Sequence, residues 1–446
     1  MKTGLKEFIR YTSLNVLGMI GLSGYILADT YFISKGLGAN GLAALNLAIP
    51  IYSFIHGTGL MLGMGGATKY AILKSQKEPG KSNQVFTNTL YLTAIFTAIF
   101  IFTGIFLPGK ITSLFGANKT VFTMAKIYLE VILLFSPAFL LNQVLICFIR
   151  NDGSPKLSMF AMLTGSLANI FLDYIFIFPF HMGILGAVLA TAFAPIISIC
   201  ILSWHFITKK NKFQPSKAKF SPALAENILS IGLPSLITET ASGIVIIVFN
   251  MIILKLQGNT GVAAYGVIAN LSLVITSIFT GIAQGTQPIT SHAYGNGDKN
   301  SLKQILKYAL VTTITLSACI YFFLFQMAGP IVSIFNSEKN YLLQQIAIPG
   351  IKLYFTAIPF AGFNIILAMY FAATGHVLPA QMISLARGLL FILPVAFCMS
   401  HFAGMAGVWL SFPITESIIT LATILRTLPR NGTPPSNHRF FAQNAK

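Results

Sequence analysis

Long apolar runs separated by short polar or basic segments fill the chain. The runs lie at about 11 to 34, 43 to 72, 86 to 107, 122 to 149, 157 to 179, 183 to 208, 223 to 255, 261 to 293, 305 to 328, 344 to 373, 378 to 401 and 404 to 427. Each is about as long as the ~20 residues that a helix needs to cross a bilayer, or longer. The pattern therefore predicts an all-α integral membrane protein with twelve transmembrane helices.

The second half of the sequence repeats the first. Gly38, Gly41, Ala43 and Ala44 reappear 220 residues later as Gly258, Gly261, Ala263 and Ala264; Pro137, Asn142 and Gly153 reappear 222 later as Pro359, Asn364 and Gly375; and Gly183 and Gly186 reappear 221 later as Gly404 and Gly407. One near-constant offset indicates a duplicated six-helix unit. Because six is even, we expect two six-helix bundles related by a pseudo-two-fold axis along the membrane normal, with a cavity between them.

The repeat also predicts the domain boundaries. We expect an N-terminal lobe at 1–208, a cytoplasmic linker at 209–222, a C-terminal lobe at 223–428 and a cytoplasmic tail at 429–446. The linker begins with KKNKFQPSKAKF, which is basic, contains a proline and lacks apolar periodicity.

Composition and charge agree with a multi-pass membrane protein. Mean hydropathy is +0.75, and only 9% of residues are charged. With the N-terminus placed inside, 21 lysines and arginines fall in inner segments and 6 in outer ones, so both termini should be cytoplasmic. The net charge of +18 therefore marks cytoplasmic loops, and we expect no nucleic-acid partner.

The four cysteines predict neither disulfides nor a metal site. They are widely separated, and each lies in or beside an apolar run: Cys147, Cys200, Cys319 and Cys398. None forms a CxxC pair, so they are best interpreted as small core residues.

Acidic side chains inside spans are the candidates for chemistry, because charge is costly in a bilayer. Asn169 and Asp173 are four residues apart and share one helix face. At ~1.5 Å per residue, Asp29 and Asp173 lie roughly 9 Å, Thr191 roughly 12 Å and Asn169 roughly 15 Å from the outer boundary. Similar depth predicts one site in the outer half of the N-terminal lobe. The alternative is that Asp173 is a structural contact between helices.

This predicted site consists only of hard oxygen ligands: two carboxylates, an amide and a hydroxyl. Such a set suits an alkali cation or a shared proton. Two buried acids close together also oppose each other's ionisation, so one of them can take up and release a proton. We therefore expect Na⁺ or H⁺ as coupling ion, with Na⁺ held by Asp29, Asn169, Asp173 and Thr191, and no other cofactor.

The sequence resembles the multidrug and toxic compound extrusion (MATE) transporters over essentially its whole length. The resemblance is carried by LADTYFISKGLGANGLAALNLAIP from Leu27 to Pro50 and by GIAQGTQPITSHAYGNGD from Gly281 to Asp298. It looks closest to the bacterial branch related to the DNA-damage-inducible and Staphylococcus-type multidrug exporters. In that branch a first-helix Asp, an Asn-x3-Asp pair and a sixth-helix Thr form the cation site, and they match Asp29, Asn169, Asp173 and Thr191.

The resemblance implies a V-shaped transporter, not an enzyme, in the bacterial plasma membrane. It would extrude cationic or amphipathic organic compounds by alternating access, driven by inward flow of sodium ions or protons. Because each chain contains a complete repeat pair, a monomer could work alone.

Further residues are candidates for the substrate cavity. Tyr25 lies one turn before Asp29, Met162 lies two turns before Asn169, and Asn142 is a polar residue in a span; ordinary helix packing is the alternative for each. Glu239 lies near the bilayer centre, where it either binds a cationic substrate or second ion, or pairs with a buried base such as Arg387 or Lys352. The sequence leaves the role of Glu416 open.

Two other functions compete with drug export. A lipid-linked precursor flippase of the same superfamily needs a basic cavity, but only Lys352 and Arg387 lie within predicted spans. A membrane-embedded transferase needs a converging catalytic set, and the seven histidines are scattered without one. The sequence does not distinguish sodium from proton coupling, and it does not identify the natural substrate or the oligomeric state.

Overall fold

The computed structural model describes residues 4–336 and 340–427, which contain helices and no strand. The first half comprises α1 (Leu5–Ser75), α2 (Pro79–Phe106), α3 (Pro108–Leu114), α4 (Lys119–Leu134), α5 (Ser136–Asn151), α6 (Pro155–Ile177), α7 (Gly183–Leu202) and α8 (Trp204–Ile207). The second half comprises α9 (Pro222–Gly295), α10 (Lys299–Phe335), α11 (Tyr341–Tyr354), a 3₁₀ turn (Phe355–Ala357), α12 (Ile358–Ala373), α13 (Val377–Leu385), a π-helical turn (Ala386–Leu390) and α14 (Ile392–Thr427). The predicted tail at 429–446 lies outside the described residues.

Glycines divide the longest helices into pairs of spans. Gly38 in α1, Gly258 in α9 and Gly404 in α14 have φ of 64°, 61° and 53°, which only glycine adopts without strain. Conversely, α4 and α5 are bent by 49° and together make one span. α11 and α12 also form one span, and α13 continues into the first part of α14. Counted in this way, the described residues contain the twelve predicted spans.

The backbone shows the duplication that the sequence predicts. Gly38 and its counterpart Gly258 have nearly the same ψ, −158° and −155°. Gly153 and Gly375, and likewise Gly183 and Gly404, also have positive φ in both copies. Turns that need glycine thus recur at the offsets of the repeat.

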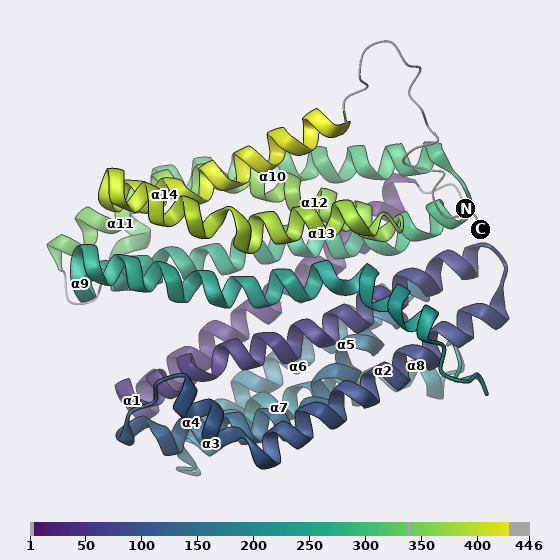
Figure 1. The fold of residues 1–446 in the computed structure, drawn as a ribbon, viewed down its shortest axis with the longest axis horizontal. Helices are drawn as coiled ribbons and strands as arrows, with labels where there is room; N and C mark the ends of the chain where they lie inside the picture. Colours follow the sequence, from purple (N-terminus) through teal and green to yellow (C-terminus); the bar gives the residue numbers. More distant parts are fainter. Residues whose placement is uncertain (1–3, 337–339, 428–446) are drawn as a thin grey trace.

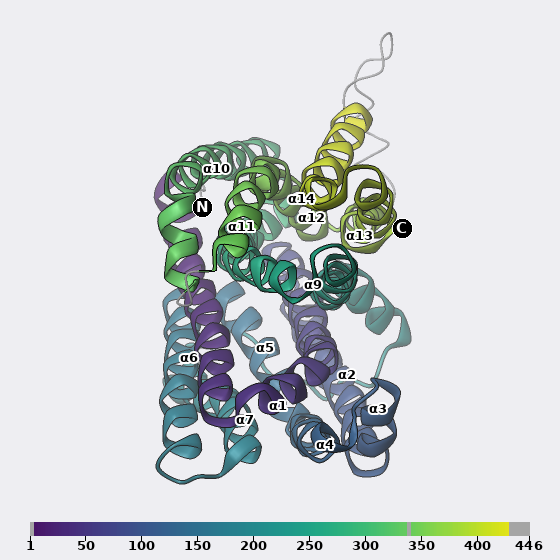
Figure 2. The same ribbon diagram turned by 90° about the vertical axis from the view of Figure 1, so that its left-hand side faces the viewer.

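The helices form two lobes, each with its own hydrophobic core (Figure 1). The two lobes exchange the beginnings of two helices. Phe8 and Tyr11, at the start of α1, lie in the core of the C-terminal lobe, whereas Ala225 and Ile228, at the start of α9, lie in the core of the N-terminal lobe. We call the end of the molecule that holds these residues the closed end. At the opposite, open end, which holds Gly38 and Gly258, the lobes diverge (Figures 1 and 2).

Close packing of α1 against α9 seals the closed end. A Cβ atom added to Gly232 would meet the carbonyl oxygen of Met61, and one added to Gly65 would meet that of Ile228. A Cβ atom on Gly285 would lie 2.7 Å from Cα of Thr12. Glycine at these positions therefore lets two helix backbones approach each other directly.

Residues 210–221, within the predicted linker, contain no helix and pack against the N-terminal lobe. Phe213 is fully buried. The buried carboxylate of Asp152 accepts hydrogen bonds from Tyr70 (2.8 Å), from Lys74 and from the backbone N–H of Lys212 (2.8 Å), and it pairs with Nε2 of His205 at 2.9 Å. Burial raises the pKa of Asp152, but the hydrogen bonds from His205, Lys74 and Lys212 outweigh burial and hold it below its usual value.

Candidate functional site: a buried carboxyl pair beside a cavity

The four residues predicted as a cation site lie together in the N-terminal lobe. Asp29 comes from α1, Asn169 and Asp173 from α6, and Thr191 from α7; all four are buried. Asp29 and Asp173 lie beside each other, close enough for their charges to interact. The Asn169 amide donates to Oγ1 of Thr191 at 3.4 Å. When the side-chain amide of Asn169 is rotated by 180°, its nitrogen donates to Asp173 Oδ2 at 3.1 Å and its oxygen accepts from the Thr191 backbone N–H at 3.2 Å.

The charge of this cluster is not balanced by a basic side chain. Within the described ranges, neither Asp29 nor Asp173 forms an ion pair with lysine, arginine or histidine, and one Oδ1 atom on each is buried without a hydrogen-bond partner. Two buried carboxyl groups in contact require a proton or a cation between them. The donors at this site are carboxylate, amide and hydroxyl oxygens, which suit an alkali ion or a proton better than a transition metal.

Tyr128 on α4 also belongs to this site, and the sequence analysis missed it. The ring is buried and lies beside Thr191. Tyr128 also lies close enough to both carboxyl groups to interact with them electrostatically. A tyrosine in an apolar run gives no signal in the sequence, because only the rotation of α4 brings it to the cluster.

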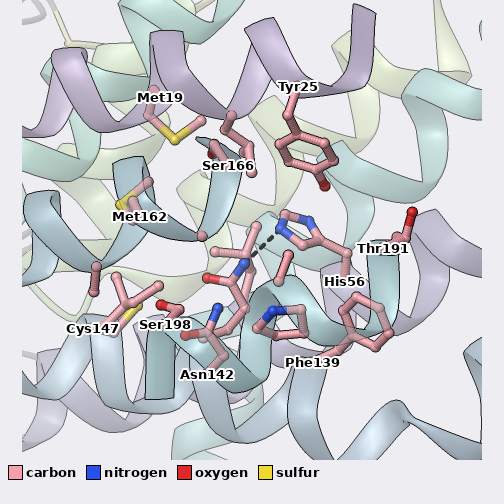
Figure 3. A pocket seen from close by; sticks show the side chains of 18 of the residues that line it. Met19, Tyr25, His56, Phe139, Asn142, Cys147, Met162, Ser166, Thr191 and Ser198 are labelled. Carbon is pink, nitrogen blue, oxygen red and sulfur yellow. Dashed lines mark hydrogen bonds between the residues drawn. The ribbon is translucent and has the colours of Figure 1, made fainter. Parts of the chain in front are cut away.

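A cavity of about 720 Å³, part of it open to solvent, lies next to the cluster. Thr191 belongs to both the cluster and the cavity wall. The three predicted cavity residues Tyr25, Asn142 and Met162 all line it, and Figure 3 shows them around the His56 ring with Phe139. Sulfur, aromatic and amide groups thus share one wall, as suits varied ligands.

Polar contacts inside the cavity connect different helical segments. The Tyr25 and Tyr52 hydroxyls are 2.6 Å apart, and Oδ1 of Asn142 is buried without a partner. Nε2 of His56 lies 2.6 Å from the side-chain nitrogen of Gln143, the contact drawn in Figure 3. The unpartnered amide oxygen of Asn142 is available to a ligand that donates a hydrogen bond.

Glu239 lines a second cavity of about 690 Å³ between the lobes. Its carboxylate lies 3.5 Å from Nδ1 of His56, across the boundary between the lobes. The pairing with a buried base that the sequence left open is therefore found with His56 and not with Arg387 or Lys352. Both bases have other partners, since Arg387 binds Glu416 at 2.8 Å and Lys352 lies 4.6 Å from the centre of the Phe325 ring.

Glu416, whose role was open, is an internal ion-pair residue. It is almost fully buried and accepts hydrogen bonds from both Nε and an Nη atom of Arg387. Asn364 donates to its other oxygen at 2.7 Å. Asn364 is the counterpart of Asn142 in the repeat, so the two lobes use the same amide differently.

Arg150, one of the 21 basic residues predicted on the inner side, is a buried side chain. The guanidinium is buried where the lobes meet, 2.5 Å from Oδ1 of Asn15 and 3.3 Å from Oε1 of Gln284. Its other contacts are with the sulfur atoms of Met64 and Cys147. The apolar run was predicted to end one residue earlier, and the α5 helix in fact continues to Asn151.

Comparisons with known proteins agree with this architecture. The MatE family model matches residues 16–175 and 234–398. The multidrug export protein MepA of Staphylococcus saprophyticus is 27% identical over 403 residues, which are 90% of this chain and 88% of the relative. MepA of Staphylococcus aureus strain MRSA252 is 25% identical over 422 residues, 94% and 92% of the two chains.

Solved structures share the fold at low sequence identity. A crystal structure of MATE in complex with MaL6 superposes with a TM-score of 0.89 at 24% identity, over 94% of this chain and 95% of that one. An outward-facing multidrug resistance MATE family transporter of the MOP superfamily has a TM-score of 0.87, also at 24% identity and over 94% of each chain.

Proposed function

The chain belongs to the MATE family of multidrug efflux transporters, and we propose that it is a cation-coupled antiporter for amphipathic or cationic organic compounds. The observation that carries the proposal is the Asp29–Asp173 pair, buried without a basic partner and joined through Asn169 and Thr191 to the wall of a cavity. Ion and ligand would therefore compete within one lobe.

The geometry suggests how the two sites are coupled. Asp29 and Tyr25 are one turn apart on α1, so a change in the carboxyl pair that moves α1 also moves a cavity side chain. A proton shared by the two acids, or Na⁺ held by the predicted oxygen ligands, would cancel one of the two negative charges and draw α1, α6 and α7 together. Without either, mutual repulsion of the carboxylates favours their separation.

We assign the closed end to the cytoplasm, because most lysines and arginines of the loops fall on that side. The described arrangement is then open to the outside, the state from which a ligand leaves and a coupling ion enters. Alternating access requires that the exchanged beginnings of α1 and α9 separate. We further propose that one chain suffices and that it resides in the bacterial plasma membrane.

The charge of the second cavity weighs against a flippase for lipid pyrophosphates. Such a substrate carries several negative charges and needs unpaired basic groups. Arg387 is neutralised by Glu416, while Glu239 adds a negative charge to the same wall. The cavity thus favours cations over polyanions.

Transport in liposomes tests the proposal. The purified protein would be reconstituted, and movement of ethidium would be followed under an imposed sodium gradient or an imposed pH gradient. We expect one gradient to drive uptake and Asp173→Asn to abolish it. Glu226→Gln, which neutralises an exposed acid on α9, is the matched control and should transport normally.

Each contrary result has a distinct meaning. Ethidium movement under neither gradient, extended to a panel of cationic and amphipathic dyes, would refute the exporter function. Normal gradient-driven transport by Asp173→Asn would refute the coupling site and leave the family membership intact.

A further inference from the structure

His56 stands at the junction of the two cavities. It lines the cavity of the N-terminal lobe, whereas its partner Glu239 lines the cavity between the lobes. The His56 side chain is 10% exposed and the Glu239 side chain 30% exposed, so ligand in the second cavity reaches the carboxylate more easily than the imidazole. The His56 ring also stacks on Tyr52 with ring centres 6.0 Å apart.

The hydrogen bond from Gln143 determines which ring nitrogen of His56 carries the proton. The Gln143 side-chain nitrogen can only donate, so Nε2 of the neutral ring accepts and the proton resides on Nδ1, which points toward Glu239. A second proton on Nε2 makes the ring a full counter-charge for Glu239 and obliges the Gln143 amide to turn and offer its oxygen. Gln143 is thus a positioning residue.

In this arrangement two cations compete for one carboxylate: the protonated His56 ring and an organic cation from outside. An organic cation needs the same carboxylate that His56 occupies, and flat aromatic surfaces for its body are supplied nearby by Tyr25, Tyr52 and Phe139. We propose that His56 controls binding of planar organic cations at Glu239, because the protonated imidazole competes with the ligand for the carboxylate. This inference rests on the proposed export function and specifies the ligand class of its site.

Other titratable groups lie near the His56 ring, and their pH dependence must be distinguished from that of His56. On α1 these are Tyr25, Tyr52 and Asp29, whose charge acts on both tyrosines. On α4, Tyr128 interacts electrostatically with Tyr25. Among the described residues, the polar side chains that contact the ring are Glu239 from α9 and the amide of Gln143 from α5.

Ethidium binding to the purified full chain, measured by fluorescence between pH 6 and pH 8, tests the inference. We expect the wild type to bind more weakly at pH 6 than at pH 8. His56→Gln should bind about 3- to 10-fold more tightly than the wild type at pH 6, with a flatter pH profile. Glu239→Gln should bind weakly at every pH, and His401→Gln, at an exposed histidine of α14, should match the wild type.

The pH dependence from the carboxyl pair is removed by comparing Asp173→Asn with the His56→Gln/Asp173→Asn double variant, which differ only at residue 56. His56→Asn replaces His56→Gln if the latter accumulates poorly. A wild-type pH profile in the His56 variants overturns the inference, and so does loss of binding at all pH values, which would make His56 part of the ligand site. Failure of the wild type to bind any organic cation would refute the proposed substrate class along with the inference.

Discussion

Asp152 shows how much one buried carboxylate can organise. It lies after α5 and receives side-chain contacts from Tyr70 and Lys74 of α1 and from His205 of α8, as well as a backbone hydrogen bond from the linker. Replacement by asparagine retains the size but removes the charge and part of the accepting capacity. We expect Asp152→Asn to lower the free energy of unfolding by about 2 kcal/mol, seen as a lower melting temperature in detergent at pH 7.

The pH dependence of that difference has a definite sign. The pKa of Asp152 lies below its usual value in the folded protein, so its ionised form stabilises the fold above the unfolded-state pKa of about 3.9. This stabilisation is lost as pH falls through the lower folded-state pKa. The wild type should therefore retain its advantage over Asp152→Asn from pH 5 to 8 and lose it below about pH 4. An advantage that grows below pH 4 would contradict the assignment.

At the scale of residues, the sequence identifies charged side chains that are costly to place in a membrane. It misses side chains whose role depends on how their helix is rotated about its axis. Asp29 and Asp173 could be predicted because an acid inside an apolar run has few explanations, and the four-residue spacing added Asn169. Tyr128 and His56 could not, since their roles depend on which way α4 and the second span of α1 face. The burial of Arg150 could not be predicted, because the apolar run was predicted to end at residue 149 whereas α5 continues to Asn151.

At the scale of elements, glycines determine where helices break and where they touch. The repeat predicted the shared glycines, and Gly38 and Gly258 proved to be matching kinks. The backbone contact at Gly232 could not be predicted, because nothing in α9 alone indicates that α1 crosses there. The bend between α4 and α5 lies at Pro137, which lacks the backbone N–H that a continuous helix needs; the sequence analysis used this proline only as a marker of the repeat.

Two glycine substitutions on α9 should separate the effect of the α1–α9 backbone contact from the effect of helix propensity. Gly232→Ala places a methyl group against the Met61 carbonyl and should force the closed end apart, reducing transport several-fold. Gly266→Ala meets no atom within 4 Å and should transport normally, with stability unchanged or raised by up to about 1 kcal/mol through helix propensity. The measurements are dye transport in liposomes and thermal melting. Equal effects of the two substitutions would exclude α1–α9 packing as the cause.

At the scale of the whole molecule, a buried charge lies where the lobes must separate. Arg150 has no acidic partner among the described residues, and its Nε atom makes no hydrogen bond. Both amide oxygens lie on the C-terminal side: Gln284 is on α9, and Asn15 is in the exchanged start of α1, where its own amide donates to the Gly281 carbonyl. Burial of a cation costs several kcal/mol, only partly offset by amide oxygens, whereas opening this end would hydrate the guanidinium. The closed end therefore stores free energy that favours its own opening.

Two substitutions should shift this equilibrium in opposite directions. Arg150→Met keeps an apolar side chain of similar length and removes the charge, so it should favour the closed arrangement by about 1–3 kcal/mol, or roughly 5- to 150-fold. Gln284→Ala removes one acceptor and leaves the charge, so it should favour opening. Arg10→Met, at an exposed arginine of α1, is the control and should change nothing.

Spin labels on Gly80→Cys in α2 and Gln304→Cys in α10 would report the separation of the lobes at the closed end, with the exposed Cys200, Cys319 and Cys398 replaced by serine. In Arg150→Met the short-distance population should grow, and gradient-driven transport should fall because the closed end opens too rarely. A growing long-distance population in that variant would mean that Arg150 fastens the lobes together, since its contacts with Asn15 and Gln284 would then outweigh the cost of its burial.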